Sequence, residues 1–468
     1  MFCQVNKGLG QSLAGRRWLV SGAAFAILLV STGWPPAIAA EEQQTGWTLE
    51  ELVGVALDQN PGLAAARTAA SAAEEDIAAA KGERLPKLDA VGLGEYFPRR
   101  GRLLIFRHGF RQDDNPFENA IVNYGLEVRL PLYTSGRIEH GISLAEARTE
   151  AARSRAELNR NELIFNVASG YYTGLRLQQV VAAQEAALSS LKESLRIAGL
   201  QREVGRIAPL DLLRIETRES QVERDLAGAR SAYAQTLELL KELINIPTEV
   251  SLDISGVLTP APNKIVTEAL REQALIQRPD LIALRHQVQA QKEALGIAGS
   301  RLGPQVDLKA SYRGVTGVDD GTTKDDAMLF VELRIPLYEG GVLRAQKRKA
   351  LMQLRESEQR LQAAERGALG DLERAVLDLK ASKPRIQAAR RAVQQAEESL
   401  RVEREKFAQG RGTSNDLLLA EEALLRARTE LAVALADSQI AQAALKFATG
   451  EDPVSVAGGA APSATGSN

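Results

Sequence analysis

Cysteine is almost absent from this chain of 468 residues. The only one, Cys3, lies in an amino-terminal segment that we expect to be removed from the mature protein. Without cysteine, the mature chain has no disulfide and no thiol that could carry a lipid anchor. Disulfide scaffolds and cysteine-anchored lipoproteins are therefore excluded.

Histidine is also scarce, and the motifs of common catalytic sites are missing. The three histidines, His108, His140 and His286, are far apart in the sequence and lack metal-ligand spacing. We find no glycine-rich phosphate loop, nucleophile elbow or cysteine site. We therefore expect no enzyme activity, no cofactor and no bound metal ion.

Residues 1–40 have the pattern of a secretory signal peptide. Three basic residues precede an apolar run over 18–32 that is too short to span a bilayer. Small residues follow up to Ala40, after which we expect cleavage. A retained amphipathic anchor is the alternative. Export argues against a cytosolic coiled-coil scaffold.

An excess of positive charge is missing too. The chain has 58 Lys and Arg against 60 Asp and Glu, and residues 1–40 contain three of the basic residues and none of the acidic ones. The mature net charge is therefore 55 minus 60, or −5. This acidic balance argues against nucleic acid as a partner.

The remainder of the chain contains two tandem copies of one unit. Residues 60–63 match 278–281, and Pro86 matches Pro304, both at an offset of 218. Farther on, the segment Arg-Leu-Pro-Leu-Tyr that starts at Arg129 recurs at an offset of 205, so the first copy has 13 extra residues between these landmarks. We assign the first repeat to 41–255, the second repeat to 256–450, and a disordered tail rich in Gly, Ala and Ser to 451–468.

Four segments of alternating hydrophobicity predict β-strands. They cover 123–130 and 329–335, 306–313 and, more weakly, 88–96. Because the rest is expected to be long helix with little spare apolar surface, the apolar faces should meet lipid and the charged faces water, as in a transmembrane barrel. Four strands cannot close a barrel, since about eight are needed. The chain must therefore pool its strands with copies of itself.

The alternation assigns individual side chains to the two faces of this barrel. The residues expected to face lipid are Leu126, Val128, Leu130, Leu308, Tyr312, Val331, Leu333 and Ile335. Those expected to face the lumen are Glu127, Arg129, Asp307, Lys309, Glu332 and Arg334. Tyr133 and Tyr338 are expected as aromatic anchors at the membrane interface, with packing of the adjacent hinge as the alternative.

Two helices of unusual length are predicted over 137–203 and 342–408. Each stretch has 67 residues, which corresponds to about 100 Å at 1.5 Å per residue. Pro384 is expected to bend the second. Leucines that recur every seven residues from Leu417 indicate coiled-coil packing. The other predicted helices are 62–85 and 209–246 in the first copy and 279–303 and 414–449 in the second.

Short glycine-containing segments follow the long helices. Residues 204–211 read Val-Gly-Arg-Ile-Ala-Pro-Leu-Asp, and residues 407–418 read Phe-Ala-Gln-Gly-Arg-Gly-Thr-Ser-Asn-Asp-Leu-Leu. Together with the duplicated Pro-Leu-Tyr-x-x-Gly hinge, they resemble the helix tips of the TolC-like outer-membrane efflux proteins. The resemblance covers about 48–450.

The resemblance implies a fold and a function. The fold is a mixed α and β membrane protein: a homotrimer in which four strands per chain form a twelve-stranded β-barrel in outer-membrane lipid, continuous with a long periplasmic α-helical barrel. The function is a passive exit duct of a tripartite efflux or type I secretion system. An inner-membrane transporter of the RND or ABC type would deliver substrates through a periplasmic adaptor protein.

The resemblance also implies a constriction at the periplasmic end. Asp416 matches an acidic ring of the family, Asp211 matches a carboxylate that helps to hold the trimer shut, and Phe407 takes an aromatic position. Leu419 stands where the family has a second acid, and Gly412 where it has an arginine. We expect one carboxylate ring backed by an apolar ring, with helix capping as the alternative role for Asp416. The tips expected to contact the adaptor comprise Val204, Gly205, Arg206, Gly410, Arg411 and Gly412.

Two oppositely charged loops are expected at the extracellular mouth. Residues 98–119 carry five arginines, and residues 315–327 carry four aspartates. We expect contact between the loops or binding of anionic lipopolysaccharide by the arginines. Two solvated loops are the alternative.

A periplasmic adaptor of the same pumps is the alternative function. An adaptor is also exported and also carries a helical hairpin, but it would show one hairpin flanked by compact β domains. The two hairpins and four strands of this chain favour the duct. Drugs, metal ions and proteins all fit such a duct, because the pump and the adaptor select the cargo.

Overall fold

The structure of the chain is a computed structural model that describes residues 46–96, 120–262, 267–318 and 323–454. The expected signal peptide, Cys3, His108, the arginine-rich segment and most of the expected tail lie outside the described residues. Within these ranges, no helix combines the length and the apolar character needed to cross a membrane.

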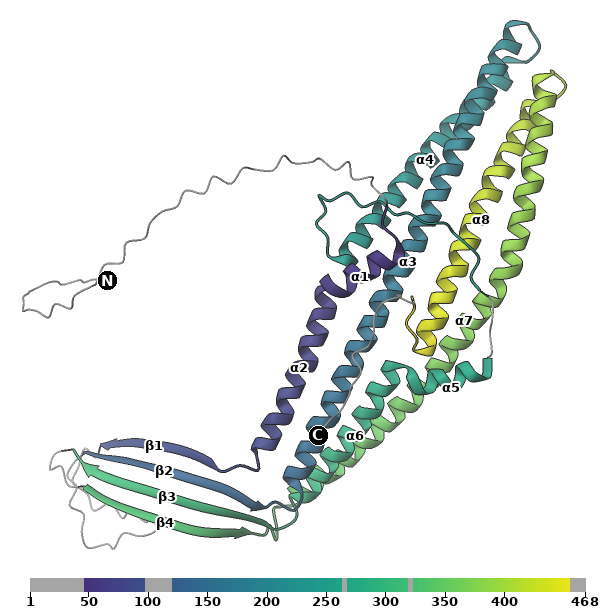
Figure 1. Cartoon of the computed structure of the whole chain (residues 1–468). Helices are drawn as coiled ribbons and strands as arrows, with labels where there is room; N and C mark the ends of the chain where they lie inside the picture. Colours follow the sequence, from purple (N-terminus) through teal and green to yellow (C-terminus); the bar gives the residue numbers. More distant parts are fainter. Residues whose placement is uncertain (1–45, 97–119, 263–266, 319–322, 455–468) are drawn as a thin grey trace, which may run out of the picture. The chain divides into compact units, whose positions relative to one another are not determined.

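The described residues form two successive sets of elements (Figure 1). The first set contains α1 (Leu49–Gln59), α2 (Pro61–Gly82), β1 (Lys87–Tyr96), β2 (Ala120–Tyr133), α3 (Arg137–Glu203) and α4 (Pro209–Ile244). The second contains α5 (Thr267–Gln277), α6 (Pro279–Ser300), β3 (Gln305–Gly317), β4 (Thr323–Arg334), α7 (Val342–Ala408) and α8 (Ser414–Thr449).

Corresponding helices of the two sets have equal lengths. They contain 11, 22, 67 and 36 residues in both. Elements up to β1 recur 218 positions later, from Leu49 to Thr267, whereas α3 and α4 recur 205 positions later, from Arg137 to Val342. The offset changes between the paired strands, where residues 97–119 in the first set correspond to residues 318–322 in the second. The extra residues of the first repeat therefore lie in its strand connection.

The two short helices α1 and α5 were not predicted. A capping box starts α1: the Thr48 backbone N–H donates to Glu51 Oε2 at 2.8 Å, and the Thr48 hydroxyl accepts from the Glu51 N–H. The Thr-x-x-Glu spacing is visible in the sequence and could have located this helix. Leu52 and Val53 of α1 are fully buried.

The expected loop over 315–327 was too long. β3 continues to Gly317 and β4 already begins at Thr323, because Gly314 pairs with Asp325 and Arg313 with Asp326. These two aspartates are therefore strand residues. The Asp325 carboxylate accepts a hydrogen bond from the Tyr312 hydroxyl at 2.8 Å.

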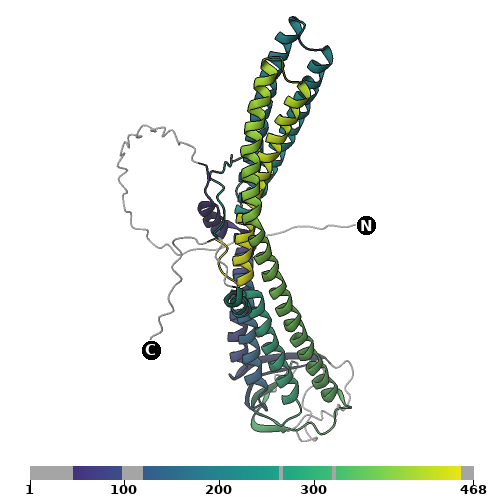
Figure 2. The same cartoon turned by 90° about the vertical axis from the view of Figure 1, so that its right-hand side faces the viewer.

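The four strands form one antiparallel sheet in the order β1-β2-β3-β4. The central pair, β2 and β3, joins the two repeats. The helices follow a similar order, because α3 contacts α2, α4, α6 and α8, whereas α7 contacts α5, α6 and α8. Next to the sheet the order is α2-α3-α6-α7, and at the distant end the hairpin α3-α4 lies beside α7-α8 (Figures 1 and 2).

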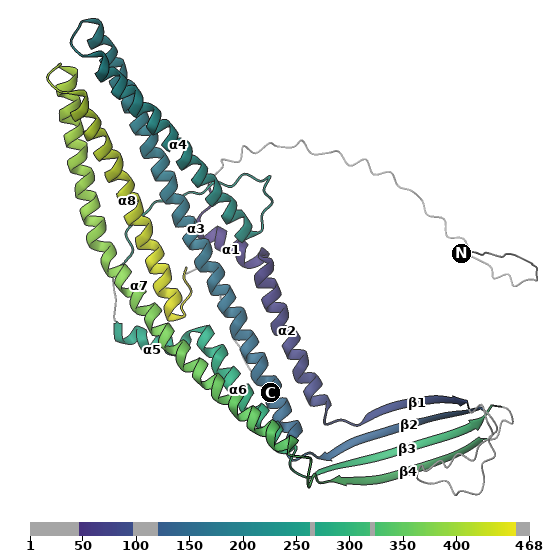
Figure 3. The same ribbon diagram turned by 180° about the vertical axis from the view of Figure 1, so that it is seen from behind.

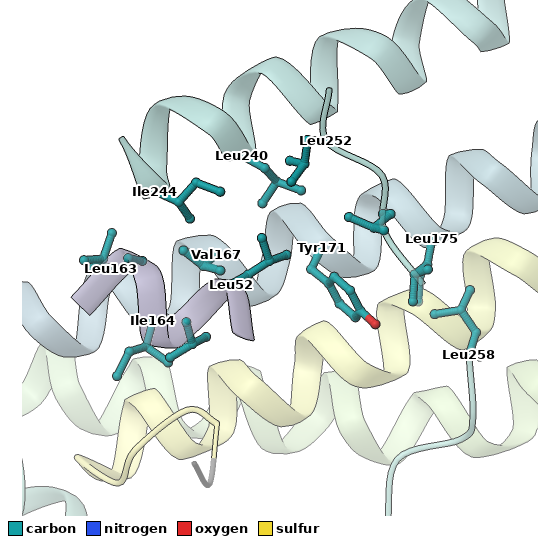
Figure 4. Close-up of a cluster of buried hydrophobic side chains, with 14 of the residues drawn as sticks. Leu52, Leu163, Ile164, Val167, Tyr171, Leu175, Leu240, Ile244, Leu252 and Leu258 are labelled. Atoms are coloured by element: carbon teal, nitrogen blue, oxygen red, sulfur yellow. The ribbon is translucent and has the colours of Figure 1, made fainter. Parts of the chain in front are cut away.

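The largest buried cluster lies where α1 crosses the middle of α3 (Figure 4). The cluster contains Leu52 of α1, Ile164 and Val167 of α3, and Leu240 and Ile244 of α4. Each of these five side chains is fully buried. At about 25 cal/mol per Å² of apolar surface removed from water, such a cluster stabilises the junction of several helices. The short helix thus fastens the first hairpin partway along its length.

Candidate functional site

The register of the sheet separates the two sets of side chains that the sequence assigned to opposite faces. Directly opposed residues in antiparallel strands share a face. Arg129 opposes Lys309 and Asp307 opposes Glu332 on one face. The other face carries the opposed pairs Leu126–Tyr312, Leu130–Leu308, Leu308–Val331 and Val306–Leu333. Which face meets lipid stays a prediction.

Ion pairs cross the charged face. Arg129 Nη2 lies 2.8 Å from Asp307 Oδ2, and Arg313 Nη2 lies 2.6 Å from Glu127 Oε1, so both pairs join β2 to β3. Lys309 pairs with Glu332 and thereby joins β3 to β4. Arg313 belongs to this network but was missing from the predicted set, although it follows the same alternation.

The charged face is not uniformly polar. Phe330 opposes Lys309, and Val91 and Leu93 of β1 lie on the same face as Glu127. These apolar side chains are on the two outer strands, and each is 44–50% exposed. The alternation of β4 places Phe330 with Glu332 and Arg334, whereas the alternation of β1 was too weak to predict the positions of Val91 and Leu93.

The apolar face is open. Leu88, Leu329, Val331 and Leu333 are 60–72% exposed, which forms a band across the sheet that no part of the described chain covers. Exposed apolar patches of this kind mark a surface that meets lipid or another protein.

A β-bulge places Tyr133 on this apolar face. The register shifts between Pro131 and Tyr133, so that Tyr133 opposes Val306. Tyr133 is 54% exposed and Tyr338 is 87% exposed. Both tyrosines are exposed in one chain, and their role as aromatic anchors stays a prediction.

The duplicated hinge between strand and helix depends on left-handed backbone. Ser135 and Gly136 have φ values of 53° and 85°, and Gly340 and Gly341 have values of 60° and 82°. Glycine adopts this region without the steric cost that a Cβ atom brings. Two successive left-handed residues turn the chain from the sheet into each long helix, which explains the shared Gly of the repeated motif.

The predicted tips are two turns of the same construction. Gly205 and Gly410 have φ values of 74° and 73°, and each follows the last residues of a long helix. The Arg206 N–H donates to the Gln201 carbonyl at 2.8 Å, and the Arg411 N–H donates to the Lys406 carbonyl at 2.9 Å. Both are Schellman caps, in which the left-handed residue is normally glycine. Of the predicted tip residues, Val204, Arg206 and Arg411 are exposed and Gly412 is half-buried.

The residues of the predicted constriction occupy different environments. Asp416 and Leu419 are exposed one turn apart near the start of α8. Asp211, near the start of α4, accepts a hydrogen bond from the Ser414 hydroxyl at 2.6 Å, which links the two hairpins. Phe407 is only 1% exposed, so its side chain packs between the hairpins and does not face an opening. Nothing in the sequence pattern pointed to Ser414.

Asp416 takes part in the cap of α8. The Asp416 N–H donates to Thr413 Oγ1 at 3.1 Å, and the Thr413 hydroxyl donates to Asp416 Oδ2 at 2.7 Å. The capping role that the sequence offered as an alternative is therefore present. It leaves the residue exposed to solvent.

A buried polar cluster farther from the tips was also missed. Glu421 of α8 is 4% exposed and lies 3.0 Å from Arg404 Nη2 of α7. Ser190 of α3 donates to the same carboxylate. A buried charge is stable only when it is paired and hydrogen-bonded, so this cluster fixes how the two hairpins pack. A glutamate beside a heptad core gives no sequence signal that separates it from a solvated one.

The two histidines among the described residues, His140 and His286, lie on helices, as predicted. His140 Nδ1 of α3 lies 2.7 Å from Glu293 Oε2 of α6. In the part of the chain that the structure describes, no three His, Cys, Asp or Glu side chains gather closely enough to hold a metal ion.

The geometry defines a class of protein. An amphipathic four-stranded sheet joined to two long helical hairpins is the fold of outer-membrane channels with a helical extension. The family model described as "Outer membrane efflux protein" matches residues 52–245 and 270–451. The chain belongs to this family, so it is an outer-membrane protein with a periplasmic extension. The TolC-type members of the family are transport proteins, not enzymes.

Individual relatives cover most of the chain. The alkaline protease secretion protein AprF of Pseudomonas aeruginosa is 25% identical over 413 residues, which cover 85% of this chain and 83% of AprF. The outer membrane protein TolC of Escherichia coli is 23% identical over 401 residues, 81% of this chain and 78% of TolC. The structure of VceC from Vibrio cholerae has a TM-score of 0.74 at 20% identity and covers 87% of this chain and 97% of VceC. These matches give no support to the adaptor alternative.

Proposed function

We propose that three copies of this chain form the outer-membrane exit duct of a tripartite efflux or type I secretion system. The observation that carries the proposal is the sheet, whose apolar face is open and whose outer strands, β1 and β4, lack a neighbouring strand within the described chain. Unpaired strand edges and an exposed apolar face are each unfavourable in water. Closure into a barrel within lipid relieves both.

The number of copies follows from the number of strands. Four strands are too few for a barrel, and eight give an interior that side chains fill. Three copies supply about twelve strands, which leaves a lumen wide enough for water and cargo. The charged face, with its pairs Arg129–Asp307 and Arg313–Glu127, then lines this lumen.

The helices support the same closure. Near the sheet, α3 has a neighbour on each side, α2 of its own repeat and α6 of the next. The corresponding helix α7 contacts α6 of its own repeat, and a following repeat would have to come from another copy. A ring of six alternating units therefore completes the wall of a periplasmic tunnel.

The duct conducts passively, and its partners select the cargo. The tips at Gly205 and Gly410 contact a periplasmic adaptor, and an inner-membrane transporter of the RND or ABC type delivers the substrate. The family is named for efflux, whereas AprF is named for secretion of an alkaline protease. Deletion of the gene separates the two cargo classes: sensitivity to drugs or metal ions indicates efflux, and loss of an exported protein indicates secretion.

Membrane fractionation tests the proposal. Expressed with residues 1–40, the protein should appear in the outer-membrane fraction as a trimer that resists heat in detergent. Alanine substitution of the exposed tip residue Arg206 serves as a matched control, because it should leave the trimer intact and reduce cross-linking to the adaptor. A monomer in the soluble periplasmic fraction would contradict the proposal.

A further inference from the structure

The two repeats place an arginine and an aspartate of matching position on the outer strands of the sheet. Arg334 ends β4 with 73% of its side chain exposed, and Asp89 is exposed in β1. β1 and β4 are the two edges of the sheet (Figure 3). The repeat offsets relate Arg334 to Arg129, 205 positions earlier, and Asp89 to Asp307, 218 positions later.

The counterparts of these residues form an ion pair inside the chain. Arg129 on β2 donates from Nη2 to Oδ2 of Asp307 on β3 over 2.8 Å. Asp307 is largely covered, with 13% of its side chain exposed. This pair joins the second strand of the first repeat to the first strand of the second repeat. The equivalent junction one repeat later would join β4, the second strand of the second repeat, to β1 of another copy of the chain.

We propose that β4 of one copy pairs with β1 of the next in the register that β2 and β3 use, and that Arg334 binds Asp89 of the partner subunit. This inference rests on the proposed trimer. Within the chain Glu127 opposes Ser311 and Val128 opposes Ala310. The offsets convert these into a seam in which Glu332 opposes Leu93 of the partner subunit and Leu333 opposes Gly92 of the partner subunit.

The length of β4 supports this register independently. β2 extends to Tyr133, and its last residues pair only with β3. β4 ends at Arg334, although residues 335–338 repeat the Ile/Leu-Pro-Leu-Tyr sequence of 130–133. Residues 335–338 would extend β4 if they had a neighbouring strand to pair with, and β1 of the second copy provides that strand. Leu337 and Tyr338, 91% and 87% exposed in one chain, are the side chains that such pairing covers.

The side chains brought together at the seam are compatible. The charged face of one copy continues into the charged face of the next, because each residue pair obtained from the repeat offsets lies on the same face of the sheet as its counterpart between β2 and β3. Arg334 opposes Val91 of the partner subunit, whereas its counterpart Arg129 opposes Lys309. The seam therefore lacks the like-charge neighbour that the junction within the chain contains. On the apolar face, Tyr338 opposes Leu88 of the partner subunit, which is 66% exposed in the single chain.

Charge exchange tests the ion pair. Arg334→Asp should lower the temperature at which the trimer dissociates in detergent, and the double variant Asp89→Arg/Arg334→Asp should restore it. Within one chain these residues are three strand spacings apart, about 14 Å, so restoration requires contact between copies. A double variant that fails to restore the dissociation temperature would overturn the ion pair. An unchanged dissociation temperature in the single variant would do the same.

Cysteine cross-linking tests the register, in a mature chain free of native cysteine. Oxidised Leu93→Cys/Glu332→Cys should give a covalent trimer on a denaturing gel. The control Leu93→Cys/Met328→Cys should not, because residue 328 is four positions, or about 13 Å, farther along β4 and a disulfide needs Cα atoms within about 7 Å. A trimer that cross-links only in the control, or in neither variant, would overturn the register. Absence of any trimer before oxidation would instead contradict the proposed function.

Discussion

At the scale of single residues, Asp416 combines a structural contact with a proposed role in transport. Its N–H and carboxylate both bond to Thr413, which caps α8. In the proposed trimer, three such carboxylates converge near the threefold axis, where they repel one another and attract cations. The carboxylate of Asp416 and the hydroxyl of Thr413 can be removed separately, which distinguishes the two roles.

Asp416→Ala should weaken the cation selectivity of the channel and its block by divalent cations, because the ring of negative charge is lost. Thr413→Ala is the matched control: it removes the cap at a cost of about 1 kcal/mol and leaves the carboxylate in place. Conductance measurements in planar bilayers compare the two variants. Equal selectivity of Asp416→Ala and the unaltered protein would rule out the gate role.

Tyr233 provides a prediction for pH dependence. Burial, and secondly the nearby Asp253 carboxylate, raise the pKa of Tyr233 to about 12 from its ordinary value of 10.0. Its hydroxyl donates to Asp253 Oδ1 at 3.1 Å, which fastens the segment after α4 to that helix. The folded chain holds this proton more tightly than the unfolded chain. The resulting stability is present below the ordinary pKa and is lost as the pH rises through the folded value.

The difference in tyrosinate absorbance between the unaltered protein and Tyr233→Phe should therefore show one group that ionises near pH 12. Asp253→Asn should move that ionisation to lower pH, because the neutral amide no longer opposes the phenolate charge. If the difference in absorbance instead changed near the ordinary tyrosine pKa of 10.0, Tyr233 would be more exposed to solvent than it is in the structure.

At the scale of elements, the helix tips depend on glycine. Gly205 and Gly410 are left-handed, and an alanine there costs about 1–2 kcal/mol. Gly205→Ala should therefore speed hydrogen exchange at the end of α3 and the start of α4. Gly199→Ala is the control, because Gly199 lies within α3 with open space around an added Cβ, and alanine there should stabilise the helix by about 0.5–1 kcal/mol. Equal effects of the two changes would contradict the left-handed tip.

The long helices were predictable to the residue, as 137–203 and 342–408, because glycine hinges and glycine tips mark both ends. α7 is one continuous helix that includes Pro384, and the bend expected there stays a prediction. The short helices α1 and α5 were missed because 11 residues hold too few turns to establish a period. Ends of the shorter helices differ by a few residues, as at Ile244, where a left-handed Asn245 stops α4 before the predicted 246.

The candidate site was less predictable than the fold. Alternation is enough to place Glu127 and Arg129 together on one face of the strand and the neighbouring apolar residues on the other face. The two faces of the sheet therefore follow from the sequence. It does not show that Asp211 meets Ser414 or that Ser190 reaches Glu421, because these contacts join helices more than 200 positions apart. Phe407 had the expected position in the sequence but lies inside the hairpin core.

At the scale of the whole molecule, a single chain leaves both its sheet and its helix layer without neighbours at their ends. Its sheet presents an apolar face and two open edges, and its helix layer ends at α7 without the α2 that a further repeat would supply. A second copy placed as the next repeat would supply both a strand for the open edge of the sheet and an α2 helix beside α7. In the proposed trimer, a closed ring of three chains would complete the barrel and the tunnel together, and the lumen of the barrel would continue into the tunnel.

Single-channel recording tests this account most directly. The purified outer-membrane trimer, inserted into a planar lipid bilayer, should produce uniform and long-lived ion-conducting steps. Each step should correspond to one water-filled lumen per trimer, since the three chains share one barrel. The Asp416→Ala variant should retain these steps with altered selectivity. A correctly folded trimer that inserts without conducting, or that conducts in three independent steps, would contradict the shared duct.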